Sequence, residues 1–96
     1  HEITIDYIQK IVCDYFNMPI DSLCSKTRKR EVVQARQIAM FFSKNLTKSS
    51  LATIGLQIGR KDHATVLHAC KTVTNLMDTD KQFRLDVEEI EKRLKV

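Results

Sequence analysis

The chain is poor in the residues that interrupt helices, and it has no tryptophan. Its 96 residues include only two glycines and one proline. So little punctuation favours a few helices over many short strands joined by tight turns. Aromatic residues are also scarce, but 43% of all residues are hydrophobic, which is enough for the modest core of one domain.

Several classes of protein are disfavoured by what is missing. No apolar run approaches the roughly 18 residues that a transmembrane helix needs. Cys13, Cys24 and Cys70 are odd in number, lack CxxC spacing and lie within apolar patterns. We therefore expect reduced, partly buried thiols in a cytoplasmic protein, without a disulfide framework. No Walker A string, GxSxG elbow or HExxH motif occurs, so we expect no enzyme activity, cofactor or metal in this chain.

Positive charge is concentrated in the middle of the chain. Ten cations oppose two acids between residues 26 and 71, a net charge of +8, whereas the remainder has six cations and ten acids, or −4. Such asymmetry is typical of nucleic-acid-binding domains. On charge alone, the alternatives are a solvated basic surface or a helical protein-interaction module with an acidic partner.

The hydrophobic pattern predicts helices at both ends of the chain. A first helix is expected to start at the cap Thr4, with Ile3 as a hydrophobic staple, and to end before 17–19, Asn-Met-Pro. Asp21 is expected to cap one short turn through Cys24. A terminal helix follows residues 79–80, and we expect it to form a packing lid, or alternatively a dimer seam. Its apolar stripe consists of Phe83, Val87, Ile90 and Leu94.

The central segment combines cations with a long helix. Residues 25–30, SKTRKR, hold four cations in five positions and should form an exposed loop, whose plainest role is solubility and whose sharper one is an arm in a narrow minor groove. A helix is predicted over 31–46. Arg36 and Lys44 are eight apart, so they should share a side of that helix and face one phosphate strand, unless this side is an ordinary wet face. Residues 47–50 should form a turn whose following helix start clamps a phosphate.

The stretch 54–70, IGLQIGRKDHATVLHAC, has the layout of a helix-turn-helix. Gly59 can adopt φ > 0, and Asp62 can accept a hydrogen bond from the backbone N–H of Ala64 or Thr65. The second helix should present its leading turn to a DNA groove. Its buried side is expected to comprise Val66, Cys70, Val73 and Met77, with Leu67, Ala69 and Leu76 beside them.

The residues of this stretch carry a more specific signal than their spacing. The string 61–66, KDHATV, followed by LHAC, resembles the (R/K)-D-H-(T/S)-T-V signature of the DNA-binding C-terminal domain of the DnaA family of bacterial replication initiators. The resemblance covers about residues 3–94. It implies an all-α, Trp-repressor-like helix-turn-helix domain of about six helices. Residues 1–96 would then be a single domain of a longer initiator, with its ATP-binding AAA+ module upstream. Such a fragment would bind double-stranded DNA as a monomer in the cytoplasm, associated with the nucleoid.

The resemblance also assigns roles to individual residues. The target would be a DnaA box, a short asymmetric origin site resembling TTATCCACA. Asp62, His63, Ala64 and Thr65 would read bases in the major groove, and Arg28 would read the minor groove. The implied phosphate contacts are Lys26, Arg30, Arg36, Gln37, Lys44, Thr47, Lys48, Leu51, Arg60, Lys61, His68 and Lys71. The chain departs from the family pattern at Ala64 and at 59–61, where Gly-Gly-Arg is common.

Alternatives to this assignment stay open. One alternative is that Asp62 is a pure helix cap and His63 an ordinary exposed residue of a first turn. A helix-turn-helix transcriptional regulator that binds a different operator would carry much of the same pattern.

Overall fold

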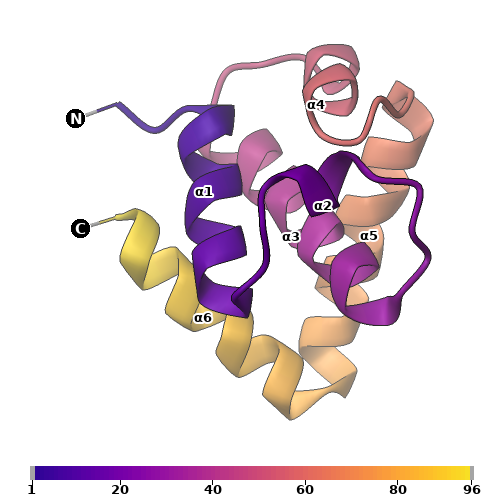
Figure 1. The fold of residues 1–96 in the computed structure, drawn as a ribbon. Helices are drawn as coiled ribbons and strands as arrows, with labels where there is room; N and C mark the ends of the chain where they lie inside the picture. Colours follow the sequence, from indigo (N-terminus) through magenta and orange to yellow (C-terminus); the bar gives the residue numbers. More distant parts are fainter. Residues whose placement is uncertain (1, 96) are drawn as a thin grey trace.

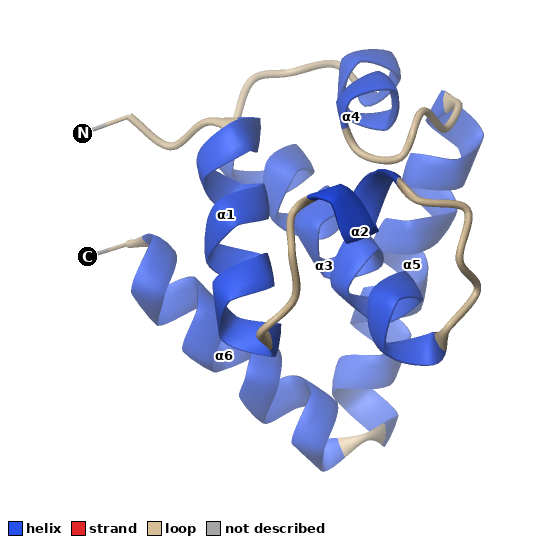
Figure 2. Ribbon diagram, in the orientation of Figure 1, coloured by secondary structure: helices blue, strands red, loops and turns tan. Residues whose placement is uncertain are grey.

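A computed structural model of the chain describes residues 2–95, and within that range all regular structure is helical (Figure 2). Six α-helices follow one another: α1 (Ile5–Phe16), α2 (Asp21–Cys24), α3 (Arg30–Leu46), α4 (Leu51–Gln57), α5 (His63–Thr79) and α6 (Lys81–Leu94). The prediction of an all-α domain of about six helices is confirmed. Among the described residues, no helix is long and apolar enough to cross a membrane.

The helix ends follow local capping chemistry. Thr4 caps α1 by accepting a hydrogen bond from the Tyr7 N–H at 3.1 Å, and Asn17 ends that helix with φ 56°. Asp80 caps α6 in the same way, through the Phe83 N–H at 3.1 Å. Each cap satisfies a backbone donor that has no partner within its own helix.

Helix α3 is the centre of the fold, because α1, α2, α4 and α5 all pack against it. Figure 1 shows α6 crossing below α1 and α5. The four-residue apolar stripe of α6 is buried, so the predicted packing lid is confirmed. The buried core draws on every helix; its largest fully buried aliphatic side chains are Ile8, Leu23, Ile38, Met40, Ile54, Ile58, Ile90 and Leu94. Burial of this kind of side chain is the main favourable term in folding.

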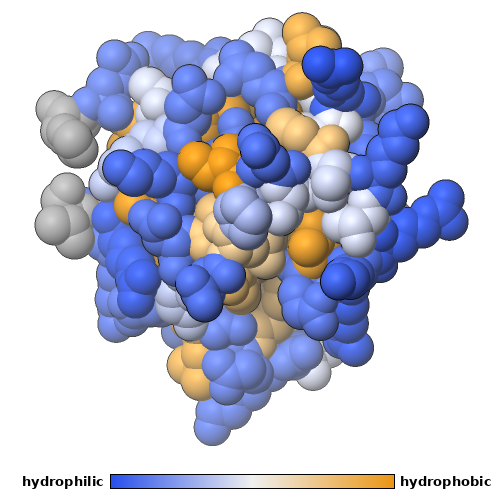
Figure 3. All heavy atoms as spheres, viewed as in Figure 1, coloured by the Kyte–Doolittle hydropathy of each residue, from blue (hydrophilic) through white to orange (hydrophobic). Residues whose placement is uncertain are grey.

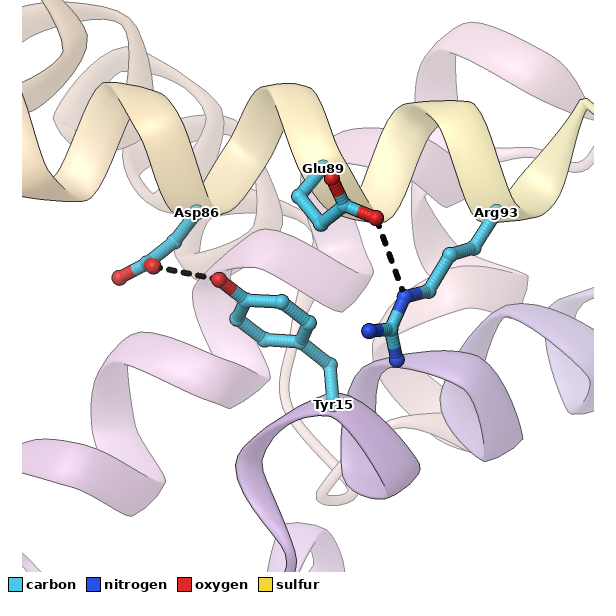
Figure 4. Close-up of polar contacts among 4 residues, drawn as sticks. All are labelled: Tyr15, Asp86, Glu89 and Arg93. Carbon is cyan, nitrogen blue, oxygen red and sulfur yellow. Dashed lines mark hydrogen bonds and ion pairs between the residues drawn. The ribbon is translucent and has the colours of Figure 1, made fainter.

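A polar clasp joins α1 to α6 on the outside of the bundle (Figure 4). The Tyr15 hydroxyl donates to Asp86 Oδ1 at 2.6 Å, and the guanidinium of Arg93 lies 4.9 Å from the centre of the Tyr15 ring. Arg93 also pairs with Glu89, one turn earlier in α6, at 3.4 Å. The hydrogen bond to Asp86 is the main cause that raises the pKa of Tyr15 to about 12. The clasp therefore favours the neutral phenol.

Three details of the predicted fold are wrong. Asp21 does not cap α2: the N-cap is Ile20, without a side-chain bond, because the Ser22 N–H bonds to the Pro19 carbonyl and starts the turn one residue earlier. Leu67 is 39% exposed, since it lies a residue beyond the Val66 face of α5. Cys24 is exposed at the end of α2, while Cys13 and Cys70 are buried; all three are free thiols, as expected.

Candidate nucleic-acid interface

The turn between α4 and α5 is folded tightly back onto α4. The Lys61 N–H donates to the Gly55 carbonyl oxygen at 2.7 Å. Gly59 has φ +83°, as predicted, and Arg60 has φ +53°. The left-handed backbone at two successive residues reverses the chain direction, and only the first of these residues is a glycine. The turn thus delivers Asp62 directly to the start of α5.

The leading turn of α5 presents four consecutive polar or small residues to solvent. Asp62 is the N-cap: its Oδ1 accepts from both the backbone N–H and the hydroxyl of Thr65, each at 2.8 Å. These two bonds are the main causes that lower the pKa of Asp62. The predicted cap is confirmed, with Thr65 as the donor. Asp62, His63, Ala64 and Thr65 are all exposed.

This geometry determines what the leading turn can offer a ligand. The Thr65 hydroxyl donates its hydrogen bond to Asp62, so the hydroxyl oxygen is left to accept a hydrogen bond from a ligand. A carboxylate and a hydroxyl acceptor suit exocyclic amines on bases, and the exposed Ala64 methyl suits a thymine methyl. His68 lies farther along α5 and its Nε2 is 3.5 Å from the Thr72 hydroxyl. A spacing of five residues turns it about 140° away from His63.

The end of α2, from which the basic loop departs toward α3, lies against the helix-turn-helix. In Figure 1 this loop and the α4–α5 turn both lie at the right of the molecule, and Figure 3 shows strongly hydrophilic side chains along that edge. The contacts agree, because a Cβ placed on Gly59 would lie 3.2 Å from the carbonyl oxygen of Leu23. The Cys24 thiol is 4.0 Å from the Gln57 carbonyl oxygen. The end of α4 and the turn after it thus touch the root of the loop, at Leu23 and Cys24. The loop's Lys26, Arg28 and Lys29 are exposed, as is Arg30 at the start of α3.

Arg36 differs from its prediction. It is only 8% exposed, and its guanidinium points inward, where Nε donates to the Leu23 carbonyl at 2.7 Å and Nη2 to the Ser25 carbonyl at 2.9 Å. The expectation that Arg36 and Lys44 share an exposed side of α3 is therefore wrong for Arg36. The spacing argument placed the side chain on a helix face, but it could not show that two carbonyls from α2 and its exit would draw the charge inward.

The remaining predicted phosphate contacts fall into two groups. Exposed side chains include Lys44, Lys48, Arg60, Lys61, His68 and Lys71. Gln37, Thr47 and Leu51 are half-buried. The Thr47 hydroxyl donates to the Ser43 carbonyl at 2.6 Å and accepts from the Ser49 N–H at 3.2 Å, so it closes the end of α3. Leu51 packs against the core, which leaves its backbone as the part that can meet a phosphate.

Two of the exposed lysines lie beside one groove between α3 and α5. Lys44 and Lys71 line it, over a floor that includes Phe41 and Cys70, with a volume of about 370 Å³. Burial raises the pKa of the Cys70 thiol, and the nearby Lys44 charge opposes that shift. Lys48 is elsewhere, in a wider depression that is also lined by residues 2–6. Lys44 and Lys71 therefore lie on one surface of the domain, and Lys48 lies on another.

Polar neighbours of these lysines escaped the sequence analysis. The amides Asn45 and Asn75 line the same groove as Lys44 and Lys71. Asn75 follows Lys71 by four residues, the spacing that places two side chains on one helix face. That spacing was the available signal. An uncharged amide adds nothing to the charge pattern that predicts a nucleic-acid-binding surface, although amides also contact phosphates.

A short helix, a tight turn and a second helix with a polar, exposed leading end define this chain as a helix-turn-helix domain, a DNA-binding module. The family described as the bacterial DnaA protein helix-turn-helix matches residues 5–73, and the chain belongs to that family.

Curated relatives agree with this assignment. The chromosomal replication initiator protein DnaA of Flavobacterium psychrophilum is 67% identical over 93 residues, which cover 97% of this chain and 20% of the relative. The protein of the same name from Bacteroides thetaiotaomicron is 56% identical, with the same coverage. That from Chlorobaculum tepidum is 41% identical over 95 residues, or 99% of this chain and 19% of the relative. The chain thus spans about one fifth of the length of these relatives.

Proposed function

We propose that this domain binds double-stranded DNA in a sequence-specific manner at DnaA boxes and thereby serves the initiation of replication. The observation that carries the proposal is the contact between the root of the basic loop and the α4–α5 turn. Because these elements touch, a duplex that received the leading turn of α5 in its major groove would have the basic loop beside the adjacent minor groove.

Base readout is divided between the two elements. Asp62, through its carboxylate, and Thr65, through its hydroxyl oxygen, would accept from base amines in the major groove, and Ala64 would contact a thymine methyl. His63 would meet a neighbouring base edge. Arg28 would enter the minor groove, where a narrow A·T-rich segment concentrates negative potential. The bound site would be asymmetric, because two different elements of one monomer read it.

Phosphate contacts would fix the register of the domain on its site. Lys44 and Lys71 line one groove on the α3–α5 surface. They would supply two positive charges to one backbone strand. Arg60 and Lys61 flank the start of α5 and would hold the other side of the major groove. The ATP-binding AAA+ module implied for a full-length initiator would lie outside this chain, and the domain itself would need no cofactor to bind DNA.

The test is a selection from random duplexes, followed by fluorescence anisotropy on the selected site at several salt concentrations. We expect recovery of a non-palindromic site that resembles a DnaA box. Recovery of palindromes would instead favour a transcriptional regulator, and the absence of any preference would favour a protein-interaction module.

Variants separate base readout from phosphate contact. His63→Ala should cost roughly 1–3 kcal/mol on the selected site and little on scrambled DNA. Lys44→Gln should weaken both duplexes alike and reduce the salt slope by about one unit. Lys81→Gln is the matched control, because Lys81 is an exposed cation on α6. An unchanged slope for Lys44→Gln, equal to that of the control, would remove Lys44 from the interface.

A further inference from the structure

Among residues 2–95, Arg36 is the one charged side chain that is buried. Burial of a charge costs free energy unless the group is well hydrogen-bonded. Arg36 meets this requirement with two backbone carbonyls, those of Leu23 and Ser25, at 2.7 and 2.9 Å. Neither partner is a carboxylate, so both hydrogen bonds of the guanidinium hold backbone rather than another side chain.

The two carbonyls lie at the point where the chain leaves α2 and enters the basic loop. Helix α2 has four residues, and such a short helix has little stability of its own. The position of the loop must therefore depend on contacts that hold its ends. Arg36 supplies two of them from α3, the central helix of the fold.

The same side chain also contacts the helix-turn-helix. A Cβ placed on Gly59 would lie 3.2 Å from both Cδ and Nε of Arg36. Glycine at this position leaves room for the Arg36 side chain and also permits the φ of +83°. One guanidinium therefore sits between the root of the basic loop and the turn that starts α5.

We propose that Arg36 is a positioning residue for minor-groove readout, which fixes the basic loop and Arg28 relative to the leading turn of α5. This role rests on the proposed function, because it specifies how two reading elements are held in one register. Arginine suits it, since the planar guanidinium directs two donors at fixed angles to two carbonyls. A lysine ammonium has the same charge but cannot reproduce this fork.

The first test uses the domain without DNA. In Arg36→Lys, the ¹⁵N relaxation of loop amides 26–29 should show new fast motion, while amides 63–65 keep the values of the unaltered domain. Lys44→Gln, on the same helix, should change neither. Arg36→Met removes both hydrogen bonds of the guanidinium without leaving a buried ammonium. This variant replaces Arg36→Lys in the test if Arg36→Lys folds poorly. Loop amides that stay as rigid in both Arg36 variants as in the unaltered domain would overturn the proposal.

The second test is a double-mutant cycle with Arg28→Ala on the selected duplex. We expect Arg36→Lys to weaken binding about as much as Arg28→Ala and to relax preference at the same base pairs. The double variant should then bind within about 2-fold of Arg28→Ala alone, because the second change removes a contact that is already lost. Additive losses, or a reduced salt slope in Arg36→Met with base preference intact, would show direct phosphate contact and overturn the positioning role.

The two proposals can fail separately. If the unaltered domain shows no base preference, the proposed DNA-box function is wrong, while loop motion released by Arg36→Lys still supports Arg36 as the residue that holds the loop. If the unaltered domain selects a box and Arg36→Lys leaves both loop motion and base preference unchanged, the function stands and the positioning role is wrong.

Discussion

The substitution Gly55→Ala tests whether the turn before α5 depends on close approach of backbone to α4. Alanine in a helix interior is ordinarily more favourable than glycine, by about 1 kcal/mol. In α4, however, a Cβ on Gly55 would overlap the Lys61 carbonyl oxygen and would lie 3.0 Å from the carbonyl carbon of Lys61 and 3.2 Å from the Asp62 carbonyl oxygen. These are backbone atoms of the turn, so no flexible side chain can move aside.

The expected sign is therefore the reverse of the usual one. Overpacking costs typically 1–3 kcal/mol. The added Cβ would also strain the hydrogen bond from the Lys61 N–H to the Gly55 carbonyl, which is 2.7 Å long in the unaltered domain. After the gain in helix propensity is subtracted, we expect a net loss of up to about 2 kcal/mol. For a domain of this size each kcal/mol lowers Tm by roughly 4–8 °C.

The assay is urea unfolding followed by circular dichroism, together with anisotropy on the selected duplex. Leu56→Ala is the matched control, since Leu56 is the next residue and is 70% exposed; it should change stability by less than about 0.5 kcal/mol. Displacement of Asp62 in Gly55→Ala should also weaken the selected site more than scrambled DNA. A Gly55→Ala domain that is more stable than the unaltered one would refute the packing described for the turn.

Three further predictions concern stability. Arg60→Gly should raise the free energy of unfolding by up to about 1 kcal/mol in urea titrations, because a left-handed conformation such as φ +53° costs an L-residue roughly 1–2 kcal/mol; an equal gain for Arg60→Ala would contradict this cause. Tyr15→Phe should lose about 1 kcal/mol near neutral pH. The pKa of Tyr15 in the folded state, about 12, exceeds the unfolded value, so the stability that the Tyr15 hydroxyl contributes is complete below pH 10 and declines as pH rises toward 12. In thermal melts across that pH window, Tm should fall less steeply with pH for Tyr15→Phe than for the unaltered domain. Ser43→Ala should be neutral or stabilising by up to about 1 kcal/mol in calorimetry, because Ser43 Oγ is buried without a hydrogen-bond partner. A loss of stability above about 1 kcal/mol would show that this hydroxyl does have a partner.

Local signals in the sequence were sufficient for the helices and for the start of α5. Apolar periodicity identified the long helices, and capping residues such as Thr4 and Asp62 marked their starts, because a cap bonds within three residues of itself. The string 61–66 identified the family, which the match over residues 5–73 then confirmed. Such features depend on neighbours along the chain, so the order of residues was enough to find them.

Only the tertiary structure decided the role of Arg36 and the placement of the basic loop. The partners of Arg36 are the carbonyls of Leu23 and Ser25, 13 and 11 residues away, and backbone carbonyls have no signature in a sequence. Helix periodicity predicted that Arg36 would face a phosphate strand, with an ordinary wet face as the alternative, and the fold buried it. The same applies to Gly55, whose missing side chain makes room for the Lys61 carbonyl. Side-chain identity can be read from the sequence, but the space around a residue is set by segments that meet only when the chain folds.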